Sequence, residues 1–335
     1  MRLLSIPLLV ALIAGCPPGT LEIDDFGPGA DDDDAADDDD ATDDDDATDD
    51  DDATDDDDAA DDDDAADDDD AVQACTGPEL QGDFIPSDDF AVAGFCAQGW
   101  ERVSGSVALT SGAQVTTSAG LECLCAVGGD VRLGEFASSL RDTTGFANLQ
   151  SIGGSLTVTW SNSLDLGGFT SLETIGGNLT LGSNNAIGDV AGFDALASIG
   201  GDVVIEWNNG SGDISGFPVL WTIGGTVRVD SNSGVTGVSG FGGLQSIAGD
   251  LSVVWNSTLG RVDGFSALGA LGGSLGIHSN SILGGIDGLL AMDTVGGDFG
   301  ITWNTLLPTA DAIAVRDAVG VNDIGGTIEI AANGP

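Results

Sequence analysis

Glu206, Asp230 and Arg228 are the residues whose types and spacing come nearest to catalytic chemistry. The two acids are 24 residues apart, one period of a repeat that places them in the same slot of adjacent coils. Strands of stacked coils lie ~4.8 Å apart, so the two carboxyl groups could approach the separation of about 5 Å found in retaining glycosidases. Arg228, two residues before Asp230, would neutralise the pair. We therefore favour a solvated surface ladder and predict that the chain is not an enzyme.

Other catalytic chemistries find little support. His278 is the only histidine, and no Ser or Cys nucleophile is placed around it, so we expect an exposed strand residue. The sequence has neither a phosphate-binding loop nor zinc-ligand spacing, and we expect no cofactor and no metal. The formal net charge is -50, with seven Arg and no Lys. That balance excludes a nucleic-acid partner, because binding phosphates requires clustered cations.

Tryptophan alternates with serine at one position of the repeat. Most coils that carry tryptophan also carry an Asp five residues before it. The true unit is therefore a 48-residue double repeat. In the interpretation that we favour, each indole packs over the small Ser of the next coil. In the alternative, half-exposed indoles spaced ~9.6 Å apart, near the repeat of a disaccharide, stack on sugars. The alternating residues are Trp160, Ser183, Trp207, Ser231, Trp255, Ser279 and Trp303.

These residues belong to a repeat marked by two motifs. Gly-Phe pairs recur from Gly145-Phe146 to Gly264-Phe265, at a spacing of 23 once and 24 thereafter. An aliphatic-Gly-Gly marker runs in step, and its aliphatic residue is taken as position zero. Weaker copies begin at Val103 and Val127, which gives about ten coils. The clear markers begin at Ile152, Ile175, Ile199, Ile223, Ile247, Leu271, Val295 and Ile324.

Positions +4 and +6 of each coil are apolar, which predicts a short β-strand with one buried face. Position +9 is nearly always Asn. Because Asn tolerates left-handed backbone and binds neighbouring main chain, we expect it to turn the corner after each strand and to bond the coils above and below. The expected ladder is Asn184, Asn208, Asn232, Asn256, Asn280 and Asn304.

The sequence therefore predicts an all-β fold, a parallel β-solenoid of about ten coils of ~24 residues. One coil cannot bury its apolar ring, whereas stacked coils share a continuous core. Ten coils would form a rod roughly 45–50 Å long. Both ends need caps, since exposed strand edges invite aggregation. We expect the region before Val127 to cap one end and a short helix over Thr309–Val319 to cap the other.

Four cysteines cluster before the clear repeats. An exported chain meets an oxidising compartment, so they predict two disulfides. A bond between Cys123 and Cys125 would close a very small loop, so we favour pairing each of these with Cys75 or Cys96. A metal site is the competing interpretation, although no His lies nearby.

The first residues have the features of an export signal. Residues 1–15 carry one Arg followed by an apolar run too short to span a bilayer. Leu12 to Cys16 resembles the lipobox of bacterial lipoproteins, which implies cleavage before Cys16 and lipidation of its thiol. We expect the exported chain to be lipid-anchored in the cell envelope, at the outer membrane, and exposed on the surface.

Residues 16–74 form the expected tether. Seven blocks of four Asp between residues 31 and 70 supply 28 of the 57 acidic residues. Such a segment lacks the apolar content needed to fold, and 40 residues could extend over ~130 Å. We favour a spacer over a loose store of Ca²⁺.

The motif L-x-x-I-G-G-x-L-x-I-x-x-N resembles the receptor L domain, a right-handed β-helix found in receptor ectodomains and fungal surface proteins. The resemblance covers about residues 75–335, with a disulfide-bearing cap and first coils over 75–126 and the repeats with their C-terminal cap over 127–335. It implies a domain that binds proteins or scaffolds a surface, and no ligand residues transfer.

Three functions remain open. The first is a surface-displayed binding or adhesion module that recognises a glycan or protein through the outer face of the solenoid. The second is a passive envelope or stalk component. The third is a carbohydrate-active β-helix enzyme that relies on Glu206 and Asp230.

Overall fold

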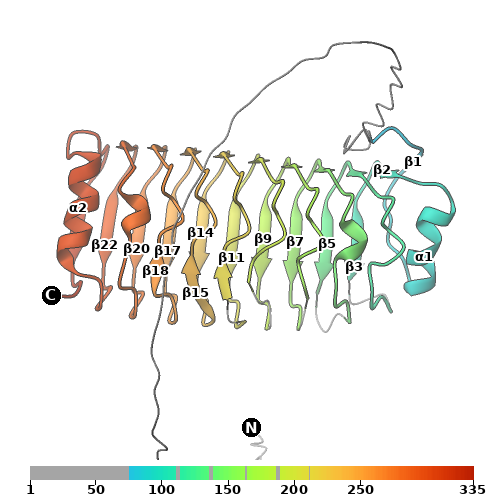
Figure 1. Cartoon of the computed structure of the whole chain (residues 1–335), viewed down its shortest axis with the longest axis horizontal. Helices are drawn as coiled ribbons and strands as arrows, with labels where there is room; N and C mark the ends of the chain where they lie inside the picture. Colours follow the sequence, from blue (N-terminus) through green and yellow to red (C-terminus); the bar gives the residue numbers. More distant parts are fainter. Residues whose placement is uncertain (1–74, 111–113, 136–138, 163, 186–188, 211) are drawn as a thin grey trace, which may run out of the picture. The chain divides into compact units, whose positions relative to one another are not determined.

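The structure is a computed structural model that describes residues 75–110, 114–135, 139–162, 164–185, 189–210 and 212–335. The expected signal segment, Cys16 and the acidic tether lie outside the described residues. From residue 75 onward the chain forms a parallel β-solenoid, with one helix at each end of the stack (Figure 1). The predicted fold class is confirmed.

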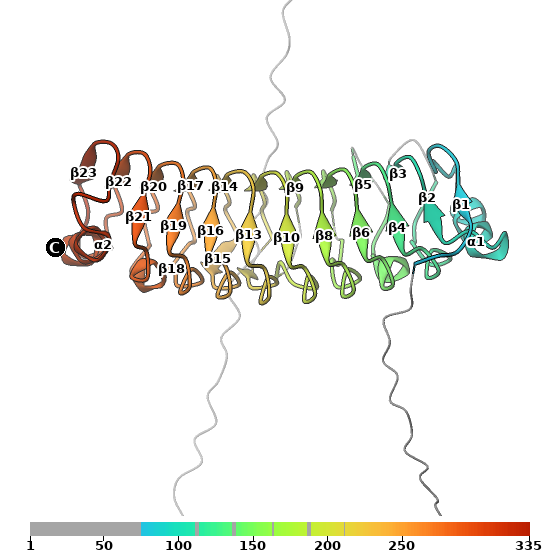
Figure 2. The same ribbon diagram turned by 90° about the horizontal axis from the view of Figure 1, so that it is seen from above.

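One face of the solenoid is a ten-stranded sheet of two-residue strands, the short-strand sheet, in which all pairs are parallel. These strands cross the rod side by side (Figure 2). From β2 onward each strand ends at the aliphatic residue of the marker, which points into the core. The strands are β1 (Glu79–Leu80), β2 (Arg102–Val103), β4 (Ala126–Val127), β6 (Ser151–Ile152), β8 (Thr174–Ile175), β10 (Ser198–Ile199), β13 (Thr222–Ile223), β16 (Ser246–Ile247), β19 (Ala270–Leu271) and β21 (Thr294–Val295).

A second ten-stranded sheet, the long-strand sheet, contains the four-residue strands predicted from positions +4 to +7. Its register is kept from strand to strand, so equivalent positions of successive coils are direct neighbours. The strands are β3 (Val107–Thr110), β5 (Val131–Gly134), β7 (Leu156–Thr159), β9 (Leu179–Gly182), β11 (Val203–Glu206), β14 (Val227–Asp230), β17 (Leu251–Val254), β20 (Leu275–His278), β22 (Phe299–Thr302) and β23 (Ile328–Ala331).

The remaining side of each coil is irregular. It contains a three-stranded sheet that the sequence did not reveal, made of β12 (Gly212–Ile214), β15 (Val235–Val238) and β18 (Arg261–Val262). Two 3₁₀ turns, η1 (Thr144–Phe146) and η2 (Asp287–Leu289), occupy the same side.

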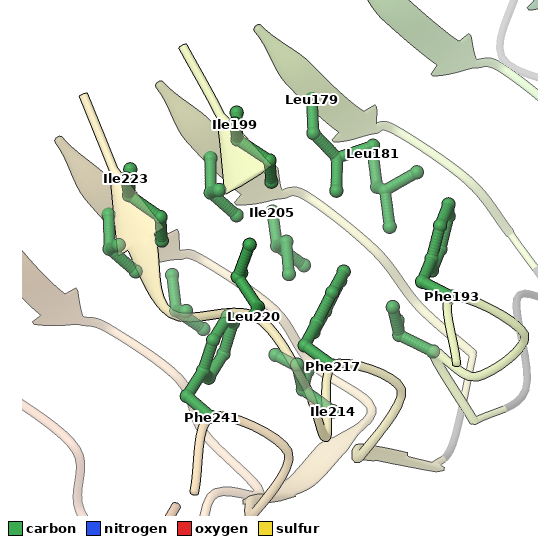
Figure 3. Packing of buried hydrophobic residues seen from close by; sticks show 14 of the residues in the cluster. Leu179, Leu181, Phe193, Ile199, Ile205, Ile214, Phe217, Leu220, Ile223 and Phe241 are labelled. Carbon is green, nitrogen blue, oxygen red and sulfur yellow. The ribbon is translucent and has the colours of Figure 1, made fainter. Parts of the chain in front are cut away.

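The core is one continuous column of apolar side chains. The Phe rings of the Gly-Phe pairs stack on one another, with centroids 5.2 Å apart for Phe193 and Phe217 and 4.9 Å apart for Phe217 and Phe241. Leu and Ile side chains from both sheets surround them (Figure 3). Full burial of one such side chain contributes roughly 1.5–3 kcal/mol, so stacking supplies the stability that a single coil lacks.

Glycine precedes each stacked Phe because the coils approach closely there. A Cβ atom on Gly240 would lie 2.5 Å from the carbonyl carbon of Ser215 in the preceding coil. A Cβ on Gly242, two residues further along, would meet nothing nearer than 3.8 Å. The Gly of the Gly-Phe pair is therefore a steric requirement of stacking.

The two ends are capped differently. Helix α2 (Thr309–Val319) has the predicted bounds and buries Ala312, Val315 and Val319. Helix α1 (Asp89–Ala97), which the sequence analysis did not predict, covers the other end and buries Val92 and Phe95.

Two disulfides fasten the N-terminal end. They join Cys75 to Cys125 and Cys96 to Cys123. The prediction that Cys123 and Cys125 pair with the two earlier cysteines is confirmed, and the competing metal site is wrong. The bonded region continues into both sheets through β2, β3 and β4.

Candidate functional site

The corner after each long strand contains a left-handed residue at position +8. Its φ lies between 54° and 64° in every coil where the structure describes it. The expectation that the Asn at +9 adopts this conformation is wrong, since the chain turns one residue earlier. The left-handed residues are Glu135, Trp160, Ser183, Trp207, Ser231, Trp255, Ser279, Trp303 and Ala332.

The Asn residues at +9 point inward and form a buried ladder. The Asn232 amide nitrogen donates to the Ile205 carbonyl and to Asn256 Oδ1, each over 2.9 Å. Asn232 Oδ1 in turn accepts from the backbone N–H of Asn208 over 3.0 Å. The expected bonding between coils is thus confirmed. The Asn side chains bond between coils because the corner buries polar backbone groups, and these groups must be hydrogen-bonded.

The tryptophans at +8 point outward. We call Trp160, Trp207, Trp255 and Trp303 the tryptophan edge; their exposed fractions are 47%, 57%, 65% and 63%. These values favour the alternative interpretation, in which the indoles are half-exposed, over the one in which each indole packs closely over the Ser of the next coil. A left-handed backbone gives the side chain no place in the core, which is already filled by positions +4, +6 and +9.

Neither backbone geometry nor burial accounts for these tryptophans. A left-handed conformation costs an ordinary L-residue roughly 1–2 kcal/mol, and Gly and Asn adopt it most easily. Ser occupies the same corner in alternate coils, so the turn does not require an aromatic ring. Strained residues that persist in this way are candidates for function.

A groove of about 460 Å³ separates the first two indoles of the edge. It is lined by Trp160, Ser183, Asn185, Trp207 and Asn209. The small Ser183 forms the gap between the rings, and the two Asn residues provide amide groups beside it. Aromatic faces with adjacent hydrogen-bonding groups suit a ligand that has both apolar and polar surface.

A row of exposed polar residues at position +10 runs beside the edge. The Asn185 amide donates to Asn162 Oδ1 over 2.9 Å, and the Asn209 amide donates to Asn185 Oδ1 over 3.2 Å. Ser233 continues the row by donating to Asn209 over 2.7 Å. Each of the two amide nitrogens has two N–H donors, and these row contacts use one. This row was not predicted, although its signal is visible as Asn, Ser or Thr after each residue of the Asn ladder.

Glu206 and Asp230 are neighbours across β11 and β14, as their spacing predicted. Arg228 lies 3.5 Å from Glu206 and donates from Nε to Asp230 over 3.1 Å. Ser231 donates a further hydrogen bond to Asp230 over 2.7 Å. The hydrogen bond to Asp230, together with the charges of both acids, raises the pKa of the Arg228 guanidinium. The three charges form a paired cluster at the end of the long strands, directly before the corner.

His278 is half-buried rather than freely exposed. It lies over Gly276 and Gly300, where a Cβ on Gly300 would be 2.7 Å from the imidazole. Its Nδ1 is 2.8 Å from Thr302 Oγ1. Burial lowers the pKa of His278, and the nearby Glu329 carboxylate opposes that shift. The two glycines at +5 were the sequence signal that the ring has space to lie flat.

The Asp preference at position +3 has a structural explanation. Its side chain accepts the backbone N–H of the same position in the next coil, as in the 2.7 Å contact from Thr226 to Asp202. At the last coil Asp298 accepts the Thr327 backbone N–H and hydroxyl, and these hydrogen bonds lower the pKa of Asp298. These acids therefore link coils.

Two further properties bear on function. Among the described residues no group of three or more His, Cys, Asp or Glu side chains is arranged to hold a metal ion. In the same part of the chain, neither helix has the length and hydrophobicity needed to cross a bilayer.

The fold and the edge together define a β-solenoid with a periodic aromatic row on one corner. No protein-family model matches the chain, and a comparison with curated proteins finds no relative. The resemblance to receptor L domains therefore remains an expectation from the repeat motif.

Proposed function

We propose that the protein is a surface-displayed binding module that recognises a glycan through the tryptophan edge. The observation that carries this proposal is the outward display of four indoles at strained corners where Ser serves equally well in alternate coils. Exposed aromatic rows of this kind mark interaction sites.

A carbohydrate fits the chemistry of the edge better than a globular protein does. Sugar rings present C–H groups that stack on indole faces and hydroxyls that bond to amides such as those of Asn185 and Asn209. A repeated row also suits a repetitive ligand. A protein epitope, in contrast, binds through a central cluster of anchors surrounded by a rim.

The test is binding to immobilised polysaccharides by the Trp207→Ala/Trp255→Ala double variant. We expect affinity to fall at least about thirtyfold, since removal of one aromatic anchor costs about 2 kcal/mol. Trp221→Ala is the matched control, because Trp221 is 54% exposed but lies before β13 and outside the edge. Equal loss in the control would refute the tryptophan edge as the binding site. No binding by the wild type would refute glycan recognition and favour a passive stalk.

We also propose that Cys16 is lipidated and that the acidic segment spaces the solenoid from a membrane. The support is the lipobox-like sequence and the poly-Asp repeat. Metabolic labelling with palmitate should mark the wild-type chain and not a Cys16→Ala variant. Labelling of both chains, or of neither, would contradict the anchor without affecting the glycan proposal.

A further inference from the structure

We infer that the ligand of the tryptophan edge is an unbranched, non-anionic polysaccharide that lies along the rod with two sugar units per tryptophan. The inference rests on the proposed function and specifies its substrate class. It combines the spacing of the indoles, the spacing of the polar row and the charges next to the edge.

The spacing of the indoles supplies the repeat length. Trp and Ser alternate through seven consecutive coils, and the long-strand sheet has no shift in register between them. Successive indoles are therefore two strands apart, ~9.6 Å. In a flat β-1,4-linked hexose chain each sugar is rotated by half a turn relative to its neighbour. Every second ring therefore presents the same face, at a spacing similar to that of the indoles. One indole can then stack on every second sugar.

The sugar between two stacked sugars lies over the Ser that separates two indoles. Ser183 leaves the groove between Trp160 and Trp207 open, and Ser231 and Ser279 have the same left-handed corner backbone between the later indoles. The polar row at +10 provides one side chain per coil, hence two per disaccharide. Each sugar of the chain thus meets either an indole or a small Ser and lies beside one polar side chain.

The charges next to the edge disfavour an anionic polymer. Arg228, the cation beside the corners of Trp207 and Ser231, is already paired with Glu206 and Asp230. The chain as a whole has a formal charge of -50, which repels anionic glycans. The row at +10 is composed of neutral groups, and these pair best with hydroxyls.

The length of the tryptophan edge determines how many sugar units it can contact. Trp160 and Trp303 are six strand spacings apart, ~29 Å, which corresponds to about seven sugars. Affinity should rise with each added disaccharide, because every further contact is intramolecular once the first has formed. Beyond about eight units it should level off.

The experiment moves one indole without removing it. In Trp207→Ser/Ser183→Trp the number of edge indoles is unchanged, and both sites have the same left-handed backbone, with φ 57°. The probes are β-1,4-linked gluco-oligosaccharides of two to eight units, measured by titration calorimetry. We expect the wild type to bind the octamer at least tenfold more tightly than the tetramer, and the exchanged variant to show a smaller gain, because the indole at position 183 is out of step with the other three.

The Trp207→Ser single variant shows how much of the effect comes from losing an indole at position 207, apart from gaining one at position 183. Thermal unfolding verifies that each variant is folded. If the exchanged chain does not fold, Trp255→Ser/Ser279→Trp makes the same test two coils further on. A xylo-oligosaccharide, whose chain twists with three units per turn, should show no comparable gain with length. Wild-type affinity in the exchanged variant, or binding independent of length, would overturn the inference. Such results would leave the proposed function standing, since that fails if the wild type binds no glycan or if Trp221→Ala weakens binding as much as the edge variant does.

Discussion

At the residue scale, two adjacent positions of each corner have different structural roles. The residue at +8 adopts the left-handed backbone and points outward, and the Asn at +9 satisfies the buried backbone of the preceding coil. Because the second residue holds the turn together, the first is free to vary in size. The indoles could therefore be placed there with little effect on folding.

This division predicts that a corner tryptophan contributes little to stability. Trp207→Asn should change the free energy of unfolding by less than about 1 kcal/mol, because relief of left-handed strain offsets lost contacts. Phe217→Ala, in the core stack, should cost about 3–5 kcal/mol. Chemical denaturation measures both. A loss at Trp207 comparable to that at Phe217 would restore the interpretation in which the indole is a packing residue.

The Asn ladder should behave in the opposite way. Asn232→Ala leaves the Ile205 carbonyl and the Asn208 backbone N–H without their partner, at a cost of about 3 kcal/mol or more. Asn209, which is exposed one position after its own ladder residue, is the control, and Asn209→Ala should remain within about 0.5 kcal/mol of the wild type. Similar unfolding midpoints for the two variants would contradict a structural ladder.

His278 gives the long-strand sheet a pH dependence. Because burial lowers its pKa in the folded state, the unfolded chain binds more protons between the ordinary value of 6.5 and the lowered one. Stability should therefore fall as the pH drops from 7 through that window. His278→Gln removes this contribution, so the difference in unfolding free energy between wild type and variant should change between pH 7 and pH 5. A constant difference would show that the ring titrates normally.

At the element scale, the long strands and their register were predictable because the repeat specifies them many times over, and helix α2 was predictable from its own spacing. Strand positions +4 and +6 recur in every clear coil, and α2 has the spacing of a short helix. Helix α1 occurs once and outside the repeat, so nothing reinforced its weaker pattern. The orientation of the indoles was not predictable either, since it depends on one backbone dihedral that Trp and Ser adopt alike.

The Gly-Phe pairs provide a test at this scale. Gly240→Ala should destabilise the fold by about 1–3 kcal/mol, because its Cβ would overlap the backbone of Ser215. Gly242→Ala meets nothing nearer than 3.8 Å and should be neutral or slightly stabilising. Thermal unfolding of the two variants compares sites only two residues apart. Equal effects would mean that the close approach of the coils is not what requires glycine.

At the scale of the whole molecule, constant register converts a recurring residue into a straight row. The Phe stack, the Asn ladder and the tryptophan edge are three such rows, one in the core, one at the corner and one outside it. The disulfides and α1 close one end of the stack and α2 covers the other. A rod built in this way can present a periodic ligand-binding surface without any enclosed pocket.

The most direct test of this account is the solvent accessibility of the edge indoles. The chain has six tryptophans, so a Trp100→Phe/Trp221→Phe variant keeps only the four of the edge. The account predicts that its fluorescence is red-shifted and quenched by acrylamide nearly as readily as that of free tryptophan. Blue-shifted emission that resists quenching would show that the indoles are buried, and the proposed binding surface would not exist.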